Sequence, residues 1–350
     1  MTHQYSPQQP AQTGNIPGET REVASHVWRI TLPIPFPLKT VNVYALIGER
    51  GWTLVDAGIG MPDTRATFKA GLELAGLHIE RLESIILTHR HPDHIGLSGE
   101  LQEQSGARVY MHTLDKAAIH VMWTGNMPKR FGNVSHFLIQ HGLLPTQLWM
   151  ANVEPEVAQQ LIRIPPPDVI QTVEDGEEIE LAGETYRVYW TPGHADGQIC
   201  LYQERNKLFL AADHVLPRIT PNIGLYTEKD RPNPLDDYLK SLDKVANLPA
   251  DLVLPGHGEP FADLAGRIHE IKAHHVEREG QILQLLTREP QHATQIADQL
   301  FKGRLKGDEA RRMGVAEMVA HLEHMRYNQV ITCKANSDGL LLYSPLDSAL

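Results

Sequence analysis

The chain has 350 residues and a formal net charge of −11, from 32 Lys and Arg against 43 Asp and Glu. This balance argues against a protein that binds a polyanion through bulk electrostatic attraction. No apolar run approaches the roughly 18 residues that cross a bilayer, so no membrane span is expected. Two cysteines, Cys200 and Cys333, are too few for a disulfide framework or a cysteine-rich zinc site. Histidine is abundant instead, with 19 residues.

The N-terminal segment is rich in Gln and Pro and poor in apolar residues. Residues 1–22 are therefore predicted to form a disordered lead-in. No Lys or Arg precedes Arg21 and no long apolar segment follows it. We therefore expect no secretory leader and a cytoplasmic protein.

Residues 23–285 alternate short strand-like runs with helical stretches. A helix is predicted over 63–75, an apolar strand over 84–88 and a long helix over 264–286, which is the order of a layered α/β domain with a mixed sheet. Residues 113–165 differ and predict a helical insertion with several aromatic and Met side chains. This insertion either supplies an apolar wall for a substrate or packs as a helical hairpin on the sheet.

The C-terminal residues 286–350 predict two helices followed by two strands joined by a turn, which is the order of a winged helix. Residues 291–350 hold seven Lys and Arg against seven Asp and Glu. The helix that would read a groove, 316–325, carries Glu317 and Glu323 and no Lys or Arg. We expect this unit to form a packing or oligomerisation surface, with a homo-oligomer left open, and nucleic acid is not favoured as a partner.

The most informative segment is T-H-R-H-P-D-H at residues 88–94, directly after the apolar strand at 84–88. It places three imidazoles and a carboxylate within six residues. Neighbouring side chains of a strand point to opposite faces, so His89 and His91 could converge only at a strand end or in the loop after it. A strand–loop–helix junction permits all four groups to converge. Imidazole nitrogen and carboxylate oxygen together suit Zn²⁺ or another borderline divalent ion.

Three further residues each lie at a turn that closes a strand. His194 stands in T-P-G-H after one apolar run, Asp213 in A-A-D-H after another, and His257 in L-P-G-H after a third. Each strand would carry its residue to the rim of a sheet. As isolated tripeptides these are weak signals, but as an ordered set they imply two metal ions rather than one.

Through these motifs and their order, the sequence resembles the metallo-β-lactamase-fold superfamily over roughly residues 27–280. The resemblance implies an α/β fold, an αββα sandwich, here with a helical insertion and a C-terminal winged-helix domain. It implies two groups of metal ligands that share one bridging carboxylate: His89, His91 and His194; Asp93, His94 and His257; and Asp213 between them. Asp93 and Asp213 are the expected catalytic residues, and Asp56 matches the family's carboxylate that orients ligands.

The sequence departs from true zinc β-lactamases, which place a cysteine in the second metal site. Here Cys200 lies on a predicted strand and is expected in the core. The residue set is similar to that of the hydroxyacylglutathione hydrolase, lactonase and ribonuclease branches. The C-terminal unit resembles that of the lactamase-β-like subfamily, some of whose members are described as endoribonucleases.

The leading hypothesis is hydrolysis of a small-molecule acyl substrate, an ester, thioester or lactone, by an enzyme with two divalent metal ions. Zn²⁺ is the first expectation, with Mn²⁺ or Fe²⁺ as alternatives. A metal-dependent endoribonuclease or other phosphodiesterase is the alternative function. Iron-dependent redox chemistry of the same fold is a third, but diiron relatives carry Glu where this sequence has His91, which favours hydrolysis.

Several further residues are candidates for substrate contact because they follow the predicted metal ligands in the chain: Arg218, Tyr226, Tyr238, His274 and Arg278. His214 either lines the site or lies in the core. The string 269–275 does not have the helical histidine spacing of a zincin, because position 273 is Ala, so its histidines are expected to be structural. His321 and His324 are also expected to be structural.

Overall fold

The first sheet of the protein has seven strands that pair in chain order. The structure is a computed structural model that describes residues 16–123, 127–147 and 160–346, with the side chains of 127–131 excepted. The strands are β1 Thr20–Ala24, β2 Val27–Pro33, β3 Thr40–Ile47, β4 Trp52–Val55, β5 Leu82–Ile86, β6 Arg108–His112 and β7 Ile170–Val173. The first four strands are antiparallel neighbours, and β4 to β7 pair in parallel.

The strand expected over 84–88 is β5, which begins and ends two residues earlier. Helices α1, Pro62–Ala75, and α3, Ser98–Ser105, with the short η1, Ile79–Arg81, lie in the connections between the parallel strands. β1 begins within the range 1–22 that was predicted to be a disordered lead-in, and residues 1–15 lie outside the described part of the chain.

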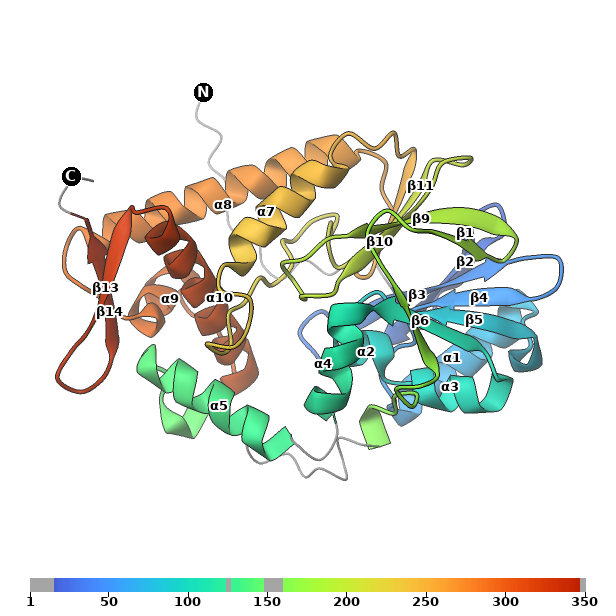
Figure 1. Cartoon of the computed structure of the whole chain (residues 1–350), viewed down its shortest axis with the longest axis horizontal. Coiled ribbons are helices and arrows are strands. Elements are labelled where there is room, and N and C mark those ends of the chain that lie inside the picture. The colour runs from blue at the N-terminus through green and yellow to red at the C-terminus, as the bar shows by residue number, and fades with distance from the viewer. Residues whose placement is uncertain (1–15, 124–126, 148–159, 347–350) are drawn as a thin grey trace.

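The second sheet has five strands in the order β12-β11-β10-β9-β8. They are β8 Glu178–Leu181, β9 Glu184–Trp190, β10 Ile199–Gln203, β11 Leu208–Ala212 and β12 Leu252–Pro255. β11 and β12 pair in parallel, and α7, Pro234–Val245, connects them. Helix α8, Leu264–Leu286, has the bounds expected from the sequence and runs from the sheets towards the C-terminal elements (Figure 1).

Three apolar layers hold the two sheets and their helices together. Tyr44 and Ile86 of the first sheet pack with Leu201 and Leu210 of the second to form the layer between the sheets. The outer face of the first sheet packs against α1 and α3, and the outer face of the second against α7 and α8. The layers therefore follow the order helices, sheet, sheet, helices, and the mixed α/β architecture expected from the sequence is confirmed.

The insertion is helical where the structure describes it, with α4 Thr113–Trp123, α5 Met127–Gln140 and η2 Pro145–Gln147. Phe137 and Leu138 of α5 are buried against the C-terminal helices, so these two side chains form core and not a substrate wall. Trp149, another aromatic of the insertion, lies outside the described residues. Among the residues that the structure describes, no helix has the length and apolar character that a membrane crossing requires.

The C-terminal unit consists of α9 Ala293–Phe301, α10 Asp308–Tyr327, β13 Ile331–Ala335 and β14 Leu341–Pro345. α10 begins eight residues before the expected 316, because a charged first turn with Asp308 and Glu309 precedes its apolar part. Its middle is almost entirely buried. The core of the unit also takes in the end of α8 and part of α5.

Two buried histidines link α8 to α10. His275 Nδ1 and His321 Nε2 lie 3.1 Å apart, and His321 Nδ1 lies 2.9 Å from the carbonyl oxygen of Glu317. A carbonyl only accepts, so His321 carries its proton on Nδ1 and accepts from His275 through Nε2. Burial lowers the pKa of His275 to about 2 and that of His321 to about 3.

We expect the free energy of unfolding to fall as the pH drops below about 6.5. The unfolded histidines take up protons near that pH while the native rings stay neutral, so acid favours the unfolded state by about 1.4 kcal/mol per pH unit for each ring. The free energy of unfolding, measured with guanidinium, should fall for both proteins between about pH 7 and pH 5. In His321→Gln this fall should be roughly 2 kcal/mol smaller than in the wild type. The control is His269→Gln, at an exposed position of α8. Its free energy of unfolding should fall by as much as that of the wild type over the same pH range. An equal loss in all three proteins would show that His321 does not titrate in this way.

Candidate metal centre

The residues that the sequence singles out for metal binding meet at one edge of the two sheets. We call them the His/Asp cluster: His89, His91, Asp93, His94, His194, Asp213 and His257. In the second sheet, β10 is antiparallel to β9 and β11, and β11 is parallel to β12, so β9, β11 and β12 end at the same edge. The segment from His89 to His94 lies in the loop after β5 and in the short α2, Pro92–Ile95. A backbone hydrogen bond of 2.9 Å from Ile199 N to Thr88 O joins the two sheets beside it.

The first group of the cluster is His89, His91 and His194. One ring nitrogen of each lies within 4.8 Å of those of the other two. His91 Nδ1 and His194 Nε2 are only 2.8 Å apart, and the rings of His89 and His91 are nearly perpendicular, at 87°. Three nitrogens that converge from different directions are what a tetrahedral metal site needs.

The second group is Asp93, His94 and His257, whose ligand atoms also lie within 4.8 Å of one another. Asp93 Oδ2 lies 3.5 Å from His257 Nε2 and 3.9 Å from His94 Nε2. Asp213 stands between the groups, with Oδ2 3.4 Å from His194 Nε2 and 3.3 Å from His257 Nε2. Its other oxygen, Oδ1, lies 3.5 Å from His94 Nε2. This carboxylate therefore lies within 3.5 Å of histidines of both groups.

Backbone carbonyls orient two of the rings. His257 Nδ1 donates to Thr40 O at 2.6 Å, and His194 Nδ1 donates to Asn222 O at 2.8 Å. Because a carbonyl only accepts, each ring carries its proton on Nδ1 and leaves the lone pair of Nε2 free. Fixing the tautomer of a histidine in this way is how proteins prepare it for metal binding.

Asp56 orients the other end of the cluster, as the sequence predicts for it. It accepts hydrogen bonds of 2.8 Å from the backbone N and the hydroxyl of Thr88, and one of 2.8 Å from His94 Nδ1. Since the Thr88 hydroxyl donates to Asp56, it accepts from His89 Nδ1, 3.0 Å away. Asp56 itself has a φ of +61°, a strained conformation for a residue other than Gly, and such strain is concentrated at functional sites.

The site has buried polar atoms without partners, which is the test of whether a metal ion fits. His89 Nε2, His94 Nε2 and Asp213 Oδ1 are buried and make no hydrogen bond. Burial and the neighbouring rings of His94 and His91 lower the pKa of His89 well below its ordinary value, so its Nε2 lone pair is free. Burial alone would raise the pKa of Asp213, but His257 and His94 hold it well below its ordinary range. A buried polar atom without a partner costs roughly 1–3 kcal/mol, which ligation to a cation would remove. The unprotonated Nε2 of His89 and the ionised carboxylate of Asp213 therefore fit a divalent metal ion. Burial alone would lower the pKa values of His94 and His257, but Asp213 beside them raises both, and a metal ion bound there would take the place of their protons.

Residues 37–257, more than half of the chain and the whole of the His/Asp cluster, match the family described as the metallo-beta-lactamase superfamily. The chain belongs to this superfamily. The probable metallo-hydrolase YqjP of Bacillus subtilis is 27% identical over 311 residues, which are 87% of this chain and 93% of that protein.

Two solved structures of the superfamily are similar over nearly the whole chain. A metallo-beta-lactamase family protein from Thermus thermophilus is 36% identical, with a TM-score of 0.80 over 93% of this chain and 100% of that one. A beta-lactamase domain protein from Burkholderia ambifaria is 28% identical, with a TM-score of 0.84 over 96% of this chain and 97% of that one. Coverage of this extent includes most of the C-terminal unit, so that unit is shared with the two relatives.

A further positioning residue of the candidate site, Asp115, is one that the sequence does not reveal. This aspartate of α4 is fully buried and accepts from Arg90 N, from the Arg90 guanidinium and from Gly197 N, at 2.8, 3.0 and 2.9 Å. Arg90 lies between His89 and His91, and Gly197 lies three residues after His194. Asp115 therefore holds the two histidine-bearing loops of the first group together. It belongs to no local motif that could have revealed it.

The residues expected at the substrate are spread over different environments. Arg218 is exposed, and His274 is partly buried on α8. Tyr238 is a correction, because its side chain is 0% exposed and its hydroxyl donates to His214 O at 2.9 Å. Arg278 is only 7% exposed, and its guanidinium packs over the Phe301 ring at 4.9 Å.

His214 and Tyr226 have structural surroundings. His214 is fully buried and belongs to none of the metal-binding groups found among the described residues. The Tyr226 hydroxyl donates to Asn222 Oδ1 at 2.8 Å, and Arg312 packs over its ring at 4.9 Å. Tyr226 therefore contacts the C-terminal unit.

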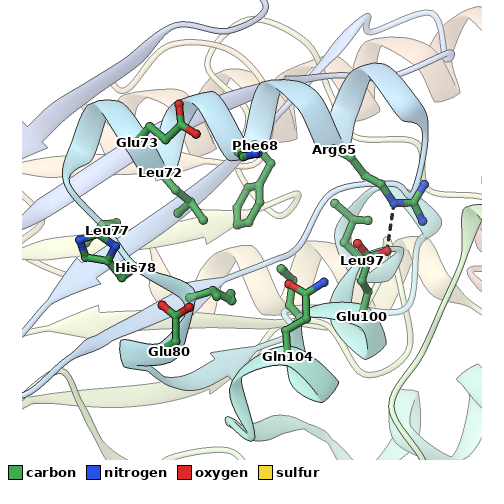
Figure 2. Close-up of a pocket in the computed structure, with 13 residues that line it drawn as sticks. Arg65, Phe68, Leu72, Glu73, Leu77, His78, Glu80, Leu97, Glu100 and Gln104 are labelled. Atoms are coloured by element: carbon green, nitrogen blue, oxygen red, sulfur yellow. Dashed lines mark hydrogen bonds and ion pairs between the residues drawn. The ribbon is translucent and has the colours of Figure 1, made fainter.

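A separate groove of about 410 Å³ lies between α1 and α3. Figure 2 shows Phe68 and Leu72 pointing into it and an ion pair between Arg65 and Glu100, 2.9 Å long, at one end. None of its lining residues belongs to the His/Asp cluster. The groove is therefore not the mouth of the candidate metal centre.

Proposed function

We propose that the protein is a hydrolase that uses two divalent metal ions held by the His/Asp cluster. The observation that carries this proposal is the position of Asp213. Its Oδ2 lies 3.4 Å from His194 Nε2 of the first group and 3.3 Å from His257 Nε2 of the second, while its buried Oδ1 makes no hydrogen bond. A carboxylate between two groups of imidazoles is the arrangement that supports a dinuclear centre.

In this proposal His89, His91 and His194 hold one ion, Asp93, His94 and His257 hold the other, and Asp213 bridges them. Two divalent ions bound there would supply a nucleophilic hydroxide at neutral pH and polarise the substrate carbonyl. The ligand chemistry suits Zn²⁺ first, with Mn²⁺ and Fe²⁺ as alternatives.

The chain's own contribution is orientation and proton transfer. Asp56 and the carbonyls of Thr40 and Asn222 accept from the Nδ1 atoms of three rings, so Nε2 is the nitrogen of each ring that is available to an ion. Asp93 is 8% exposed, more than the buried rings beside it, and we assign to its carboxylate the transfer of a proton to the leaving group.

The proposed substrate is an ester, thioester or lactone of small-molecule size. The net charge of −11 offers no electrostatic attraction for a polyanion. Helix α10, which would have to read a groove of nucleic acid, is buried along its middle. The name of the relative YqjP, a probable metallo-hydrolase, supports hydrolysis over redox chemistry. A phosphodiester substrate remains the alternative, and Arg218 and His274 are the proposed polar contacts for either.

We further propose that residues 23–285 form the catalytic domain and that 286–350 form a winged-helix-like unit with a packing role. The order of α9, α10, β13 and β14 supports the winged-helix assignment. The packing role is supported by the shared core with α8 and α5, to which Ile282 and Leu138 contribute.

A substrate screen tests the proposed reaction. Protein loaded with Zn²⁺, Mn²⁺ or Fe²⁺ would be assayed with p-nitrophenyl esters, acyl thioesters, lactones, bis-p-nitrophenyl phosphate and single-stranded RNA. We expect turnover of an acyl substrate, lost in Asp93→Ala and retained in Asp251→Ala, which replaces an exposed aspartate outside the cluster. Cleavage of RNA with steep salt dependence would favour the phosphodiesterase alternative. Oxygen consumption by the iron-loaded protein would favour the redox reading.

A further inference from the structure

His194 differs from the other histidines of the cluster in what holds it. The rings of His89 and His94 are oriented by Thr88 and Asp56, and that of His257 by Thr40 O, all within the first sheet or the ends of its strands. His194 instead donates from Nδ1 to Asn222 O at 2.8 Å. Asn222 lies in the long connection after β11, between Asp213 and α7.

The side chain of Asn222 is bound to the C-terminal unit. Its Nδ2 donates to Met313 O at 3.4 Å and to Glu317 Oε2 at 3.3 Å, and both acceptors belong to α10. Its Oδ1 accepts from the Tyr226 hydroxyl at 2.8 Å. Both hydrogens of the amide and one lone pair of its oxygen are thus used, which fixes the amide and the carbonyl of the same residue.

Further contacts attach the same loop to α10. The backbone N of Leu225 donates to Ala316 O at 3.1 Å. The Arg312 guanidinium lies 4.9 Å from the centre of the Tyr226 ring and is itself paired with Glu309 at 2.6 Å. The position of this loop therefore depends on the position of α10.

α10 is held firmly within the C-terminal unit. Its residues from Gly314 to Leu322 are buried except Glu317, which faces Asn222. The helix packs against α9, α7 and α5 (Figure 1). Because protein interiors are close-packed and transmit strain, we expect a displacement of this buried helix to reach the loop bound to it.

We propose that the C-terminal unit is a positioning element of the metal site, acting from α10 through Asn222 on His194. The inference rests on the proposed metal site but not on the identity of the substrate. Only the group of His89, His91 and His194 depends on this link. Loosening this link should therefore weaken the binding of the ion in that group. The binding of the ion held by Asp93, His94 and His257 should be unchanged.

The test measures the affinity of the purified full-length chain for Zn²⁺ by competition with a chromophoric chelator. Asn222→Ala keeps the backbone carbonyl but loses its attachment to α10, and we expect one Zn²⁺ to bind about 10–100-fold more weakly, the usual effect of losing a group that orients a ligand. Glu317→Ala should weaken the binding of the same ion. Glu317→Gln should rescue it, because the glutamine oxygen can still accept from Asn222 Nδ2.

The matched control is Asn328→Ala. Asn328 follows the last residue of α10 and its amide contacts His324 at 3.1 Å, so its loss disturbs the same helix far from the cluster. We expect Asn328→Ala to lower the melting temperature without changing either Zn²⁺ affinity. Wild-type affinity for both ions in Asn222→Ala, or equal weakening of both ions in Asn222→Ala and Asn328→Ala, overturns the positioning role. A wild-type chain that binds no Zn²⁺ contradicts the metal site itself, whereas two bound ions without acyl hydrolysis contradict only the proposed reaction.

Discussion

Replacement of Asp213 by alanine should remove metal from the protein and reduce turnover by more than about a hundredfold, the upper end of what the loss of a merely orienting residue costs. Asp213 is the one residue whose carboxylate lies within 3.5 Å of histidines of both groups, among the described members of the cluster. Without it, the negative charge that lies 3.4 Å from His194 Nε2 and 3.3 Å from His257 Nε2 is lost. Two cations could then be bound close together only against their mutual repulsion.

The experiment compares metal content and turnover of Asp213→Ala with those of the wild type. Asp251→Ala is the control, because Asp251 is an exposed aspartate beside β12, paired with Lys207 at 3.6 Å and outside the His/Asp cluster. It should keep both properties. Full metal content in Asp213→Ala would contradict the bridging role, and full turnover would contradict the assignment of the active site.

Replacement of Gly256 by alanine should have nearly the same effect on metal binding, although Gly256 offers no ligand. A Cβ there would lie 2.2 Å from Asp213 Oδ1 and 3.0 Å from His94 Cε1. The backbone cannot withdraw, because Gly256 N donates to Ala212 O and Gly256 O accepts from Asn42 N, both at 2.7 Å. The added methyl group must therefore displace the carboxylate.

We expect Gly256→Ala to bind metal at least about tenfold more weakly, the lower end of the effect of disturbing a ligand's surroundings. Overpacking should also lower the free energy of unfolding by about 1–3 kcal/mol. Gly280→Ala is the matched control, since a Cβ at this position of α8 meets nothing within 4 Å. It should stabilise the helix by roughly 0.5–1 kcal/mol and leave metal affinity unchanged. If Gly256→Ala had the same metal affinity and stability as Gly280→Ala, the inference that a methyl group at position 256 displaces the Asp213 carboxylate would be wrong.

The residues of the His/Asp cluster could be predicted from the sequence because each follows a short apolar strand and stands in a recognisable local motif. The structure brings them together for the reason that the pattern suggests: β9, β11 and β12 run in the same direction and end at one edge. Asp56 could be predicted as well, since it also ends a strand. These signals are local in the chain, and their spacing carries the information.

Asp115 and Asn222 could not be predicted in the same way. Asp115 acts on Arg90 and Gly197, which are 25 and 82 residues away, and Asn222 acts on His194, 28 residues away. Each is an isolated polar residue in a helix or loop and belongs to no recognisable motif. Only the three-dimensional arrangement gives them their partners.

Tyr238 was placed at the substrate because it follows Asp213 in the chain, but chain order says nothing about the direction of a side chain. The spacing of Leu235, Tyr238, Leu242 and Val245 is typical of one face of a helix, and these four residues are fully buried. Periodicity was thus the better guide for this residue. The apolar pattern of α10 likewise indicated a helix but did not reveal its charged first turn.

The most direct test of the central claim is the ratio of metal to protein after loading the wild-type chain with Zn²⁺ and removing the excess, measured by elemental analysis. The account predicts two ions per chain, because the Asp213 carboxylate lies within 3.5 Å of histidines of both groups. It also predicts that Asp213→Ala, treated in the same way, retains neither ion. A wild-type ratio of one or less, or the same ratio in both proteins, would contradict the account.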